Sequence, residues 1–137
     1  MNGVCLLGID HGEFGGWLEA VEPGPPPVRR ATAPGNVRAI IPVDPDGQSF
    51  VVLTGLAHLM LREGSAYRLA RGPDGTWCRA QGVDFQGFPV GWRVEGPHSF
   101  ALLIEVPEVP VDHPLVEGGT WYAVVRVDDE AHIVSPP

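Results

Sequence analysis

Side chains that are able to bind a metal ion or to transfer protons occur at three places along the chain. Asp10 and His11 follow the first apolar run, with Glu13 close behind, and His58 ends a second apolar run. A third group follows the apolar run 100–106 and consists of Glu108, Asp112 and His113. Carboxylates and imidazoles serve both as metal ligands and as general acids or bases. These residues therefore form the candidate binding face.

Internal alignment of the chain places His11, His58 and Glu108 at equivalent positions. Two imidazoles and a carboxylate on one face would suit a divalent metal, and Asp10-His11 also resembles an orienting pair for acid–base work. Asp and His are equally typical of turns, where such side chains bond to nearby backbone. The spacing is not one that dedicated metal sites use, so we favour the turn interpretation and expect no cofactor. A divalent metal on these three residues is the alternative.

The sequence contains no established catalytic signature. It has no Gly-x-Ser-x-Gly motif, no phosphate-binding loop, no dinucleotide fingerprint and no cysteine placed near a histidine. Cys5 and Cys78 lie inside apolar strand-like runs, which predicts buried free thiols and leaves a disulfide open. We therefore expect a protein that is not an enzyme, with an enzyme that uses the His11, His58 and Glu108 face as the rival.

Composition narrows the class of protein and its partners. The 137 residues carry a net charge of −8 and contain no lysine, which disfavours nucleic acid and anionic membranes as partners. The charge would suit a basic protein partner, but we favour the interpretation that it keeps the protein soluble. Gly (18) and Pro (15) separate many short apolar runs, and no run has helical periodicity. These features predict a single all-β domain with little or no helix. The run 4–9 is too short for a signal sequence or a membrane span, so a cytoplasmic protein is expected.

Apolar runs and turn residues together predict a series of strands. The run 4–9 is apolar throughout, as is typical of a strand buried on both faces. Gly72-Pro73-Asp74-Gly75 and the acidic residues 128–130 are expected to form turns. A longer loop is expected after His58. The predicted strands are 4–9, 17–22, 28–32, 37–44, 49–58, 65–71, 76–84, 88–95, 100–106, 120–127 and 131–134.

Segments of the chain align with one another at a nearly constant spacing. Residues 4–11 align with 51–58 at an offset of 47, and residues 37–44 align with 88–95 at an offset of 51. Shorter matches have offsets of 49 and 50. Several matches in the same order favour a repeat over chance similarity among glycine-punctuated strands. The predicted units are 1–35, which is incomplete, 36–85, which is complete, and 86–137.

A period near fifty with four strands per unit has the dimensions of a propeller blade. In this respect the chain resembles WD-repeat-like β-propellers, although the signature dipeptides Trp-Asp and Gly-His are absent. The resemblance implies blade-like antiparallel sheets and no catalytic residues. The aromatic residues recur in each unit, so we expect them to pack between sheets rather than to form sugar-stacking shelves. Fewer than three full units cannot close a ring, so two chains would share one, or the chain would belong to a larger assembly. A sandwich or a barrel is the alternative architecture.

Three functional hypotheses follow from these patterns. The first is a non-enzymatic protein-binding or assembly module with an acidic loop face, which completes a propeller by forming a homo-oligomer. The second is the metal-dependent enzyme described above. The third is a small acidic protein of the immunity or inhibitor type that binds a basic partner. This hypothesis rests on the net charge alone.

Overall fold

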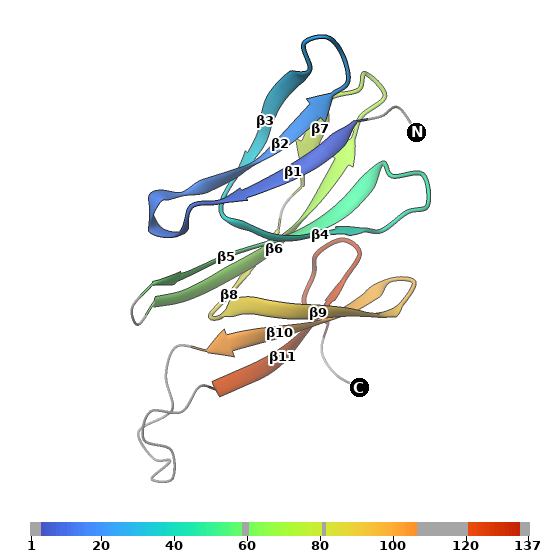
Figure 1. The fold of residues 1–137 in the computed structure, drawn as a ribbon. Helices are drawn as coiled ribbons and strands as arrows, with labels where there is room; N and C mark the ends of the chain where they lie inside the picture. Colours follow the sequence, from blue (N-terminus) through green and yellow to red (C-terminus); the bar gives the residue numbers. More distant parts are fainter. Residues whose placement is uncertain (1–3, 59–60, 81, 107–120, 135–137) are drawn as a thin grey trace, which may run out of the picture.

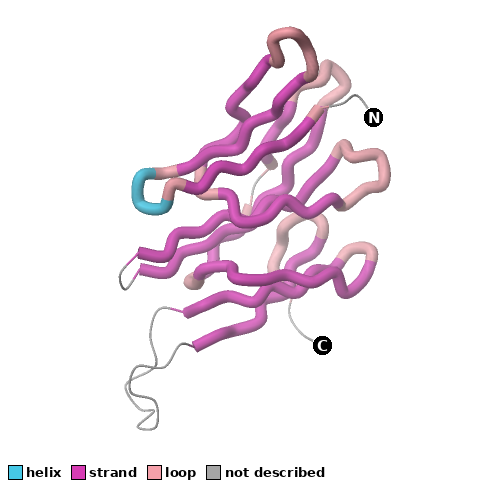
Figure 2. Tube along the Cα trace, viewed as in Figure 1, coloured by secondary structure: helices cyan, strands magenta, loops and turns pink. Residues whose placement is uncertain are grey.

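The computed structural model shows an all-β protein in which every pair of neighbouring strands is antiparallel (Figures 1 and 2). It describes residues 4–58, 61–80, 82–106 and 121–134. The strands form three sheets in which strands that follow one another in sequence lie side by side, except that β8 pairs with β6 and not with β7. Among the described residues, a single helical element occurs, the 3-10 turn η1 (Gly12–Phe14). The predicted all-β class is confirmed.

The three sheets use successive stretches of the chain. The first sheet contains β1 (Cys5–Asp10), β2 (Gly16–Glu22) and β3 (Val28–Pro34). The middle sheet contains β4 (Val37–Pro42), β5 (Ser49–His58), β6 (Leu61–Arg71), β7 (Trp77–Arg79) and β8 (Val83–Phe85). The last sheet contains β9 (Phe88–Gly96), β10 (Ser99–Val106) and β11 (Trp121–Asp128).

The middle sheet lies between the other two and is covered on both faces (Figure 1). Successive side chains of a strand point to opposite faces, and β5 shows the consequence. Val51 and Leu53 belong to a core cluster with Phe100, Leu102 and Ile104 of the last sheet. Val52 belongs to a second cluster with first-sheet residues such as Leu18. The continuous apolar run of β5 is therefore explained by burial on both sides.

Glycines let strands approach closely where β5 and β6 pair with each other. Gly55 lies directly opposite Gly64 in this pair. A Cβ atom on Gly64 would lie 2.3 Å from the Phe85 ring, and one on Gly55 would lie 2.6 Å from Pro89. The absence of side chains here allows the connection from β8 to β9 to pass close to the middle sheet.

Several predicted boundaries are corrected. The strand 76–84 is two short strands, β7 and β8, which pair with different parts of β6. The prediction of a longer loop after His58 is wrong, because β6 begins at Leu61 and pairs with β5 from that residue on. The strand 131–134 is reduced to a bridge between Ile133 and Val127 and a hydrogen bond from the Val134 N–H to the Arg126 carbonyl oxygen, at 2.8 Å.

The prediction that the run 4–9 is buried on both faces is also wrong. Strand β1 is an edge strand that pairs only with β2 among the described residues, and Cys5 and Leu7, on the face away from the core residue Leu18, are exposed. Cys78 is exposed as well, because the short β7 lies at the end of the middle sheet. Both thiols are free, as expected, but neither is buried.

The sheets show no closure into a ring within the part of the chain that the structure describes. The prediction of one domain with repeated units stays a prediction. In the described residues no helix is long and apolar enough to cross a membrane.

Candidate functional site

The turn between β1 and β2 holds the first group of candidate residues. Asp10 is the last residue of β1, His11 precedes η1 and Glu13 lies within it. The His11 ring meets the Trp17 ring edge-on, with 5.3 Å between the ring centroids. The His11 backbone N–H donates to the Gly15 carbonyl oxygen at 2.8 Å. These contacts are those of an ordered turn, in keeping with the turn interpretation.

The carboxylate of Asp10 is engaged with its surroundings. Burial alone would raise its pKa, but the Gly12 N–H donates to Oδ1 at 2.9 Å and Arg38 donates to Oδ2 at 2.7 Å. The hydrogen bonds and the positive charge outweigh burial and lower the pKa of Asp10. A carboxylate held ionised in this way is a weak proton acceptor, so Asp10 is poorly suited to general base catalysis.

The remaining candidate residues are placed only in part. His58 is the last residue of β5, whose end lies on the same side of the molecule as the β1–β2 turn (Figure 1). Its side chain and the whole of Glu108, Asp112 and His113 lie outside the described residues. Among the side chains that are described, no three His, Cys, Asp or Glu lie close enough together to hold a metal ion. The metal set of His11, His58 and Glu108 therefore stays a prediction.

A cavity of about 480 Å³ opens along the paired strands β5 and β6, next to the residues that directly precede β4. Thr54 and Ser65 share a hydrogen bond between their hydroxyl groups there, and Asn36 closes one side. The carboxylates at the cavity are those of Glu63 and Asp84. No imidazole is among the described lining residues, so neither hydroxyl has the adjacent base that a nucleophile requires.

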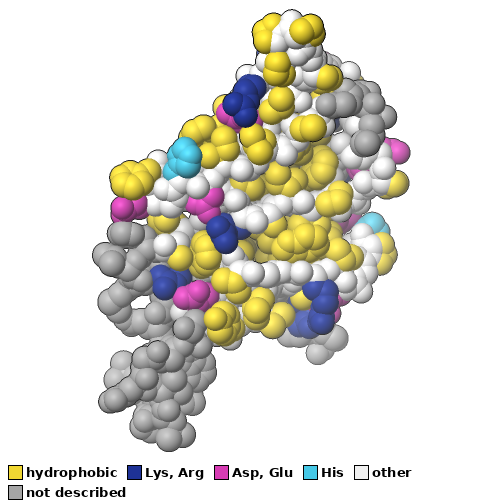
Figure 3. Space-filling model, in the orientation of Figure 1, with side chains coloured by type: hydrophobic (Ala, Val, Ile, Leu, Met, Phe, Trp, Pro, Cys, Tyr) yellow, Lys and Arg dark blue, Asp and Glu magenta, His cyan; other side chains and the backbone are white. Residues whose placement is uncertain are grey.

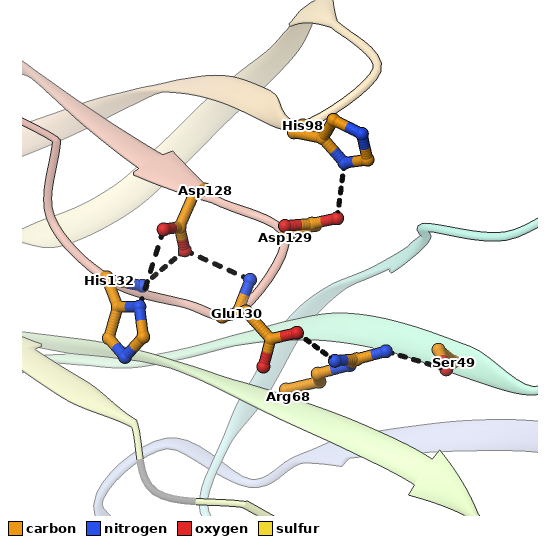
Figure 4. Close-up of polar contacts among 7 residues, drawn as sticks. All are labelled: Ser49, Arg68, His98, Asp128, Asp129, Glu130 and His132. Carbon is orange, nitrogen blue, oxygen red and sulfur yellow. Dashed lines mark hydrogen bonds and ion pairs between the residues drawn. The ribbon is translucent and has the colours of Figure 1, made fainter.

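A cluster of charged side chains that the sequence analysis treated only as a turn lies after β11 (Figure 4). Asp128 Oδ1 accepts hydrogen bonds from the backbone N–H groups of Glu130, at 3.0 Å, and His132, at 2.8 Å. Asp129 contacts His98 at 2.5 Å, and Glu130 pairs with Arg68 of β6. Arg68 also donates to the Ser49 hydroxyl at 3.3 Å. The cluster links the last sheet to the middle sheet.

Both histidines of this cluster are largely solvent-exposed, with His98 and His132 each paired to one aspartate. Ser49 contacts Arg68 rather than an imidazole, so the cluster lacks the ordered nucleophile and base of an acyl-transfer site. Its signal in the sequence is the acidic run 128–130 followed by His132, but the partners on other elements are visible only in the fold. The arrangement is that of a connection between sheets.

Exposed apolar residues form a more distinctive surface on the last sheet. Its face turned away from the middle sheet carries Leu103 (41% exposed), Tyr122 (54%) and Val124 (56%). Leu103 lies directly opposite Val124 on the neighbouring strand. Beside them, Gly91 and Ala101 add an apolar hollow of about 320 Å³. We call the surface of Gly91, Ala101, Leu103, Tyr122 and Val124 the last-sheet face.

The edge strand β9 carries exposed apolar residues on the other side of the last sheet, since Trp92 and Val94 lie opposite the inward core residues Leu102 and Phe100. Val90, Trp92 and Val94, at every second position, are each between 43% and 54% exposed. Along this side of the molecule, hydrophobic side chains gather over β4 and β9, while charged side chains are scattered (Figure 3). Six of the eleven exposed large apolar residues thus belong to the last sheet. The prediction that recurring aromatic residues pack between sheets holds for Tyr67, which is buried, and is wrong for Tyr122, which is exposed on the outward face of the last sheet.

Fold and surface define an all-β protein of three antiparallel sheets whose most prominent exposed feature is apolar. Comparisons with protein-family models, with curated proteins and with solved structures find no match to this chain.

Proposed function

We propose that the chain is a non-enzymatic protein-binding or assembly module, and that the last-sheet face is its contact surface. The observation that carries the proposal is the exposure of Leu103, Tyr122 and Val124 side by side on one sheet. Single exposed apolar residues are ordinary, but a contiguous group of this kind is typical of an interaction site. The loop face of Asp10, His11 and Glu13 is a weaker candidate, since Asp10 is paired with Arg38 of β4 and the His11 ring packs against Trp17.

The character of the surface favours binding over catalysis. Apolar surface removed from water contributes about 25 cal/mol per Å², so a partner that covers these side chains gains affinity from them. Charged side chains at this surface have partners: Glu95 binds Arg126 at 2.9 Å and Arg93 at 3.4 Å. Glu105, opposite Tyr122, binds Arg62 of β6 at 2.8 Å. A partner can therefore approach the apolar centre without leaving an unpaired charge buried.

The proposal is tested by placing a photo-crosslinking side chain at Tyr122 in the full chain and illuminating it in cells. We expect a covalent adduct with a polypeptide, and we expect its yield to fall at least tenfold when Leu103→Lys and Val124→Lys are added. A crosslinker at Val28, an exposed apolar residue of β3, is the matched control for random collisions. The proposal would be refuted if no adduct forms at Tyr122, or if the adduct yield is unchanged by Leu103→Lys and Val124→Lys.

A further inference from the structure

Two turns of the chain share the tripeptide Pro-Asp-Gly. The first, residues 45–47, lies between β4 and β5, and the second, residues 73–75, lies between β6 and β7. An aspartate followed by glycine is prone to cyclise, because glycine has no side chain that hinders access to its backbone nitrogen. The two tripeptides are identical, so the sequence alone predicts equal reactivity at Asp46 and Asp74.

The cyclisation is a condensation between the aspartate side chain and the next peptide group. The glycine nitrogen attacks Cγ of the protonated carboxyl group, an N–Cγ bond forms, and the carboxyl OH leaves with the amide hydrogen as water. Hydrolysis of the resulting succinimide returns one water to either of its carbonyl carbons. One product is aspartate, and the other is isoaspartate, in which the main chain runs through the β-carbon. The steps balance without an oxidant, a cofactor or an enzyme.

The turn between β4 and β5 leaves both reacting groups of Asp46 and Gly47 weakly held. Asp46 is exposed, and its carboxyl group has no hydrogen-bond donor among the described residues. The Gly47 N–H lies 3.5 Å from the Asp44 carbonyl oxygen, which is longer than an ordinary hydrogen bond. A Cβ placed on Gly47 would meet nothing within 4 Å, so there is room for the side chain to approach. The backbone carbonyl of Asp46 accepts the exposed Gln48 amide at 3.2 Å, which leaves the carboxyl group free to turn.

The turn between β6 and β7 holds the same groups in place. Thr76 donates its backbone N–H to Asp74 Oδ1 at 3.1 Å and its hydroxyl to Oδ2 at 2.9 Å. The Gly75 N–H donates to the Gly72 carbonyl oxygen at 2.9 Å, a bond that has to break before the nitrogen can attack. The two bonds from Thr76 also lower the pKa of Asp74, so a smaller fraction of its carboxyl group carries the proton that the reaction requires.

We infer that Asp46 is a site of spontaneous modification, at which the β4–β5 turn converts to isoaspartate through a succinimide, and that the fold protects Asp74 from the same reaction. The inference does not depend on the proposed function. Isoaspartate adds one atom to the main chain of a turn that is closed by the Val43 N–H to Ser49 carbonyl bond, at 3.1 Å, and by the Gln48 N–H to Asp44 Oδ1 bond, at 3.0 Å. The modification therefore loosens the connection between β4 and β5.

Peptide mapping of the native full chain tests the inference. The protein is held for weeks at mildly acidic pH and digested with trypsin, which separates the two sites because Arg62 and Arg71 lie between them. We expect isoaspartate at Asp46 to exceed that at Asp74 at least tenfold. In urea the two sites should react at similar rates, because the contacts of both turns are then lost. The mapping also separates both sites from Asn2-Gly3, which has related chemistry and lies outside the described residues.

Two variants test the two halves of the inference. Asp46→Glu keeps the charge but requires a six-membered ring, which forms far more slowly, so modification of this turn should disappear. Thr76→Val removes the hydroxyl bond to Asp74 and should raise isoaspartate at Asp74 at least threefold in the native protein. Thr76 is exposed, and circular dichroism of each variant shows whether the fold is retained.

Three results would overturn the inference. The first is an equal or larger amount of isoaspartate at Asp74 than at Asp46 in the native protein. The second is absence of isoaspartate at Asp46 in the native protein while the chain in urea forms it, which would show that the folded turn restrains Asp46 as well. The third is a folded Thr76→Val variant in which Asp74 stays as unreactive as in the wild type, which would show that the bonds from Thr76 are not the protection.

Discussion

The side-chain amide of Asn36 ties the β1–β2 turn to the start of the middle sheet: its Nδ2 donates to the Gly12 carbonyl oxygen at 2.7 Å. Its Oδ1 accepts the His11 backbone N–H at 3.3 Å, and its own carbonyl oxygen accepts the Gly55 N–H at 2.9 Å. Asn36 is only 8% exposed, so these groups have little access to water. One residue therefore fixes the position of the turn relative to β5.

We expect Asn36→Ala to lower the free energy of unfolding by about 1–3 kcal/mol, because it leaves buried backbone groups without partners. Urea denaturation measures the change. Gln48→Ala is the matched control, since that amide is exposed and donates only to the Asp46 carbonyl oxygen. Its effect should stay within about 0.5 kcal/mol. Equal losses from both variants would show that Asn36 does not join the two sheets.

The close approach at Gly64 gives a second prediction. An added Cβ would lie 2.3 Å from the Phe85 ring and 2.4 Å from the Gly87 carbonyl oxygen, so Gly64→Ala requires the β8–β9 connection to shift. Overpacking of this kind costs about 1–3 kcal/mol. Gly96→Ala, where a Cβ meets nothing within 4 Å, should leave the melting temperature unchanged or slightly raised. An unchanged melting temperature for Gly64→Ala would contradict the packing described above.

Strand positions could be predicted well where polarity alternates or turn residues interrupt an apolar run. The run around Val51 belongs to a strand covered on both faces, as its composition indicates. The equally apolar run around Leu7 belongs to an edge strand. Composition alone cannot separate these cases, because burial of a strand's side chains depends on whether another sheet covers each of its faces. The same ambiguity explains why both cysteines were expected to be buried.

The candidate surface was less predictable than the fold. The chemistry of Asp10 and His11 made them candidate site residues. In the structure, however, Asp10 is hydrogen-bonded to Arg38 and the His11 ring packs against Trp17. Leu103 and Val124 gave no signal, because an outward apolar residue on an end sheet has the same sequence pattern as a core residue. Only the order of the sheets in space shows which faces are left uncovered.

The exposure of Cys5 and Cys78 predicts rapid thiol chemistry in the folded protein. Dilute native protein should react with two equivalents of a thiol reagent per chain without denaturant. A Cys78→Ser variant should react with one equivalent. Labelling that appears only after unfolding would show that the thiols are buried. Labelling that requires a reducing agent would indicate a disulfide.

The turn after β11 gives the stability of the protein a dependence on pH. Burial alone would raise the pKa of Asp128, but the backbone N–H groups of His132 and Glu130 and the nearby His132 imidazole outweigh it and lower the pKa below its ordinary value of 3.8. A carboxyl group whose pKa is lower in the folded state contributes stability above its ordinary pKa. That contribution is lost as the pH falls through the lowered value.

Asp128→Asn isolates this contribution, because an amide oxygen can still accept the N–H groups of Glu130 and His132 while the charge is removed. We expect the variant to be less stable than the wild type by about 0.5–1 kcal/mol at about pH 5, since the carboxylate is partly exposed to solvent. The difference should disappear by about pH 2, where the wild-type carboxyl group is protonated as well. Urea denaturation across this range measures it. A difference that stays constant down to the lowest pH would show that the charge of Asp128 does not hold the turn against the last sheet.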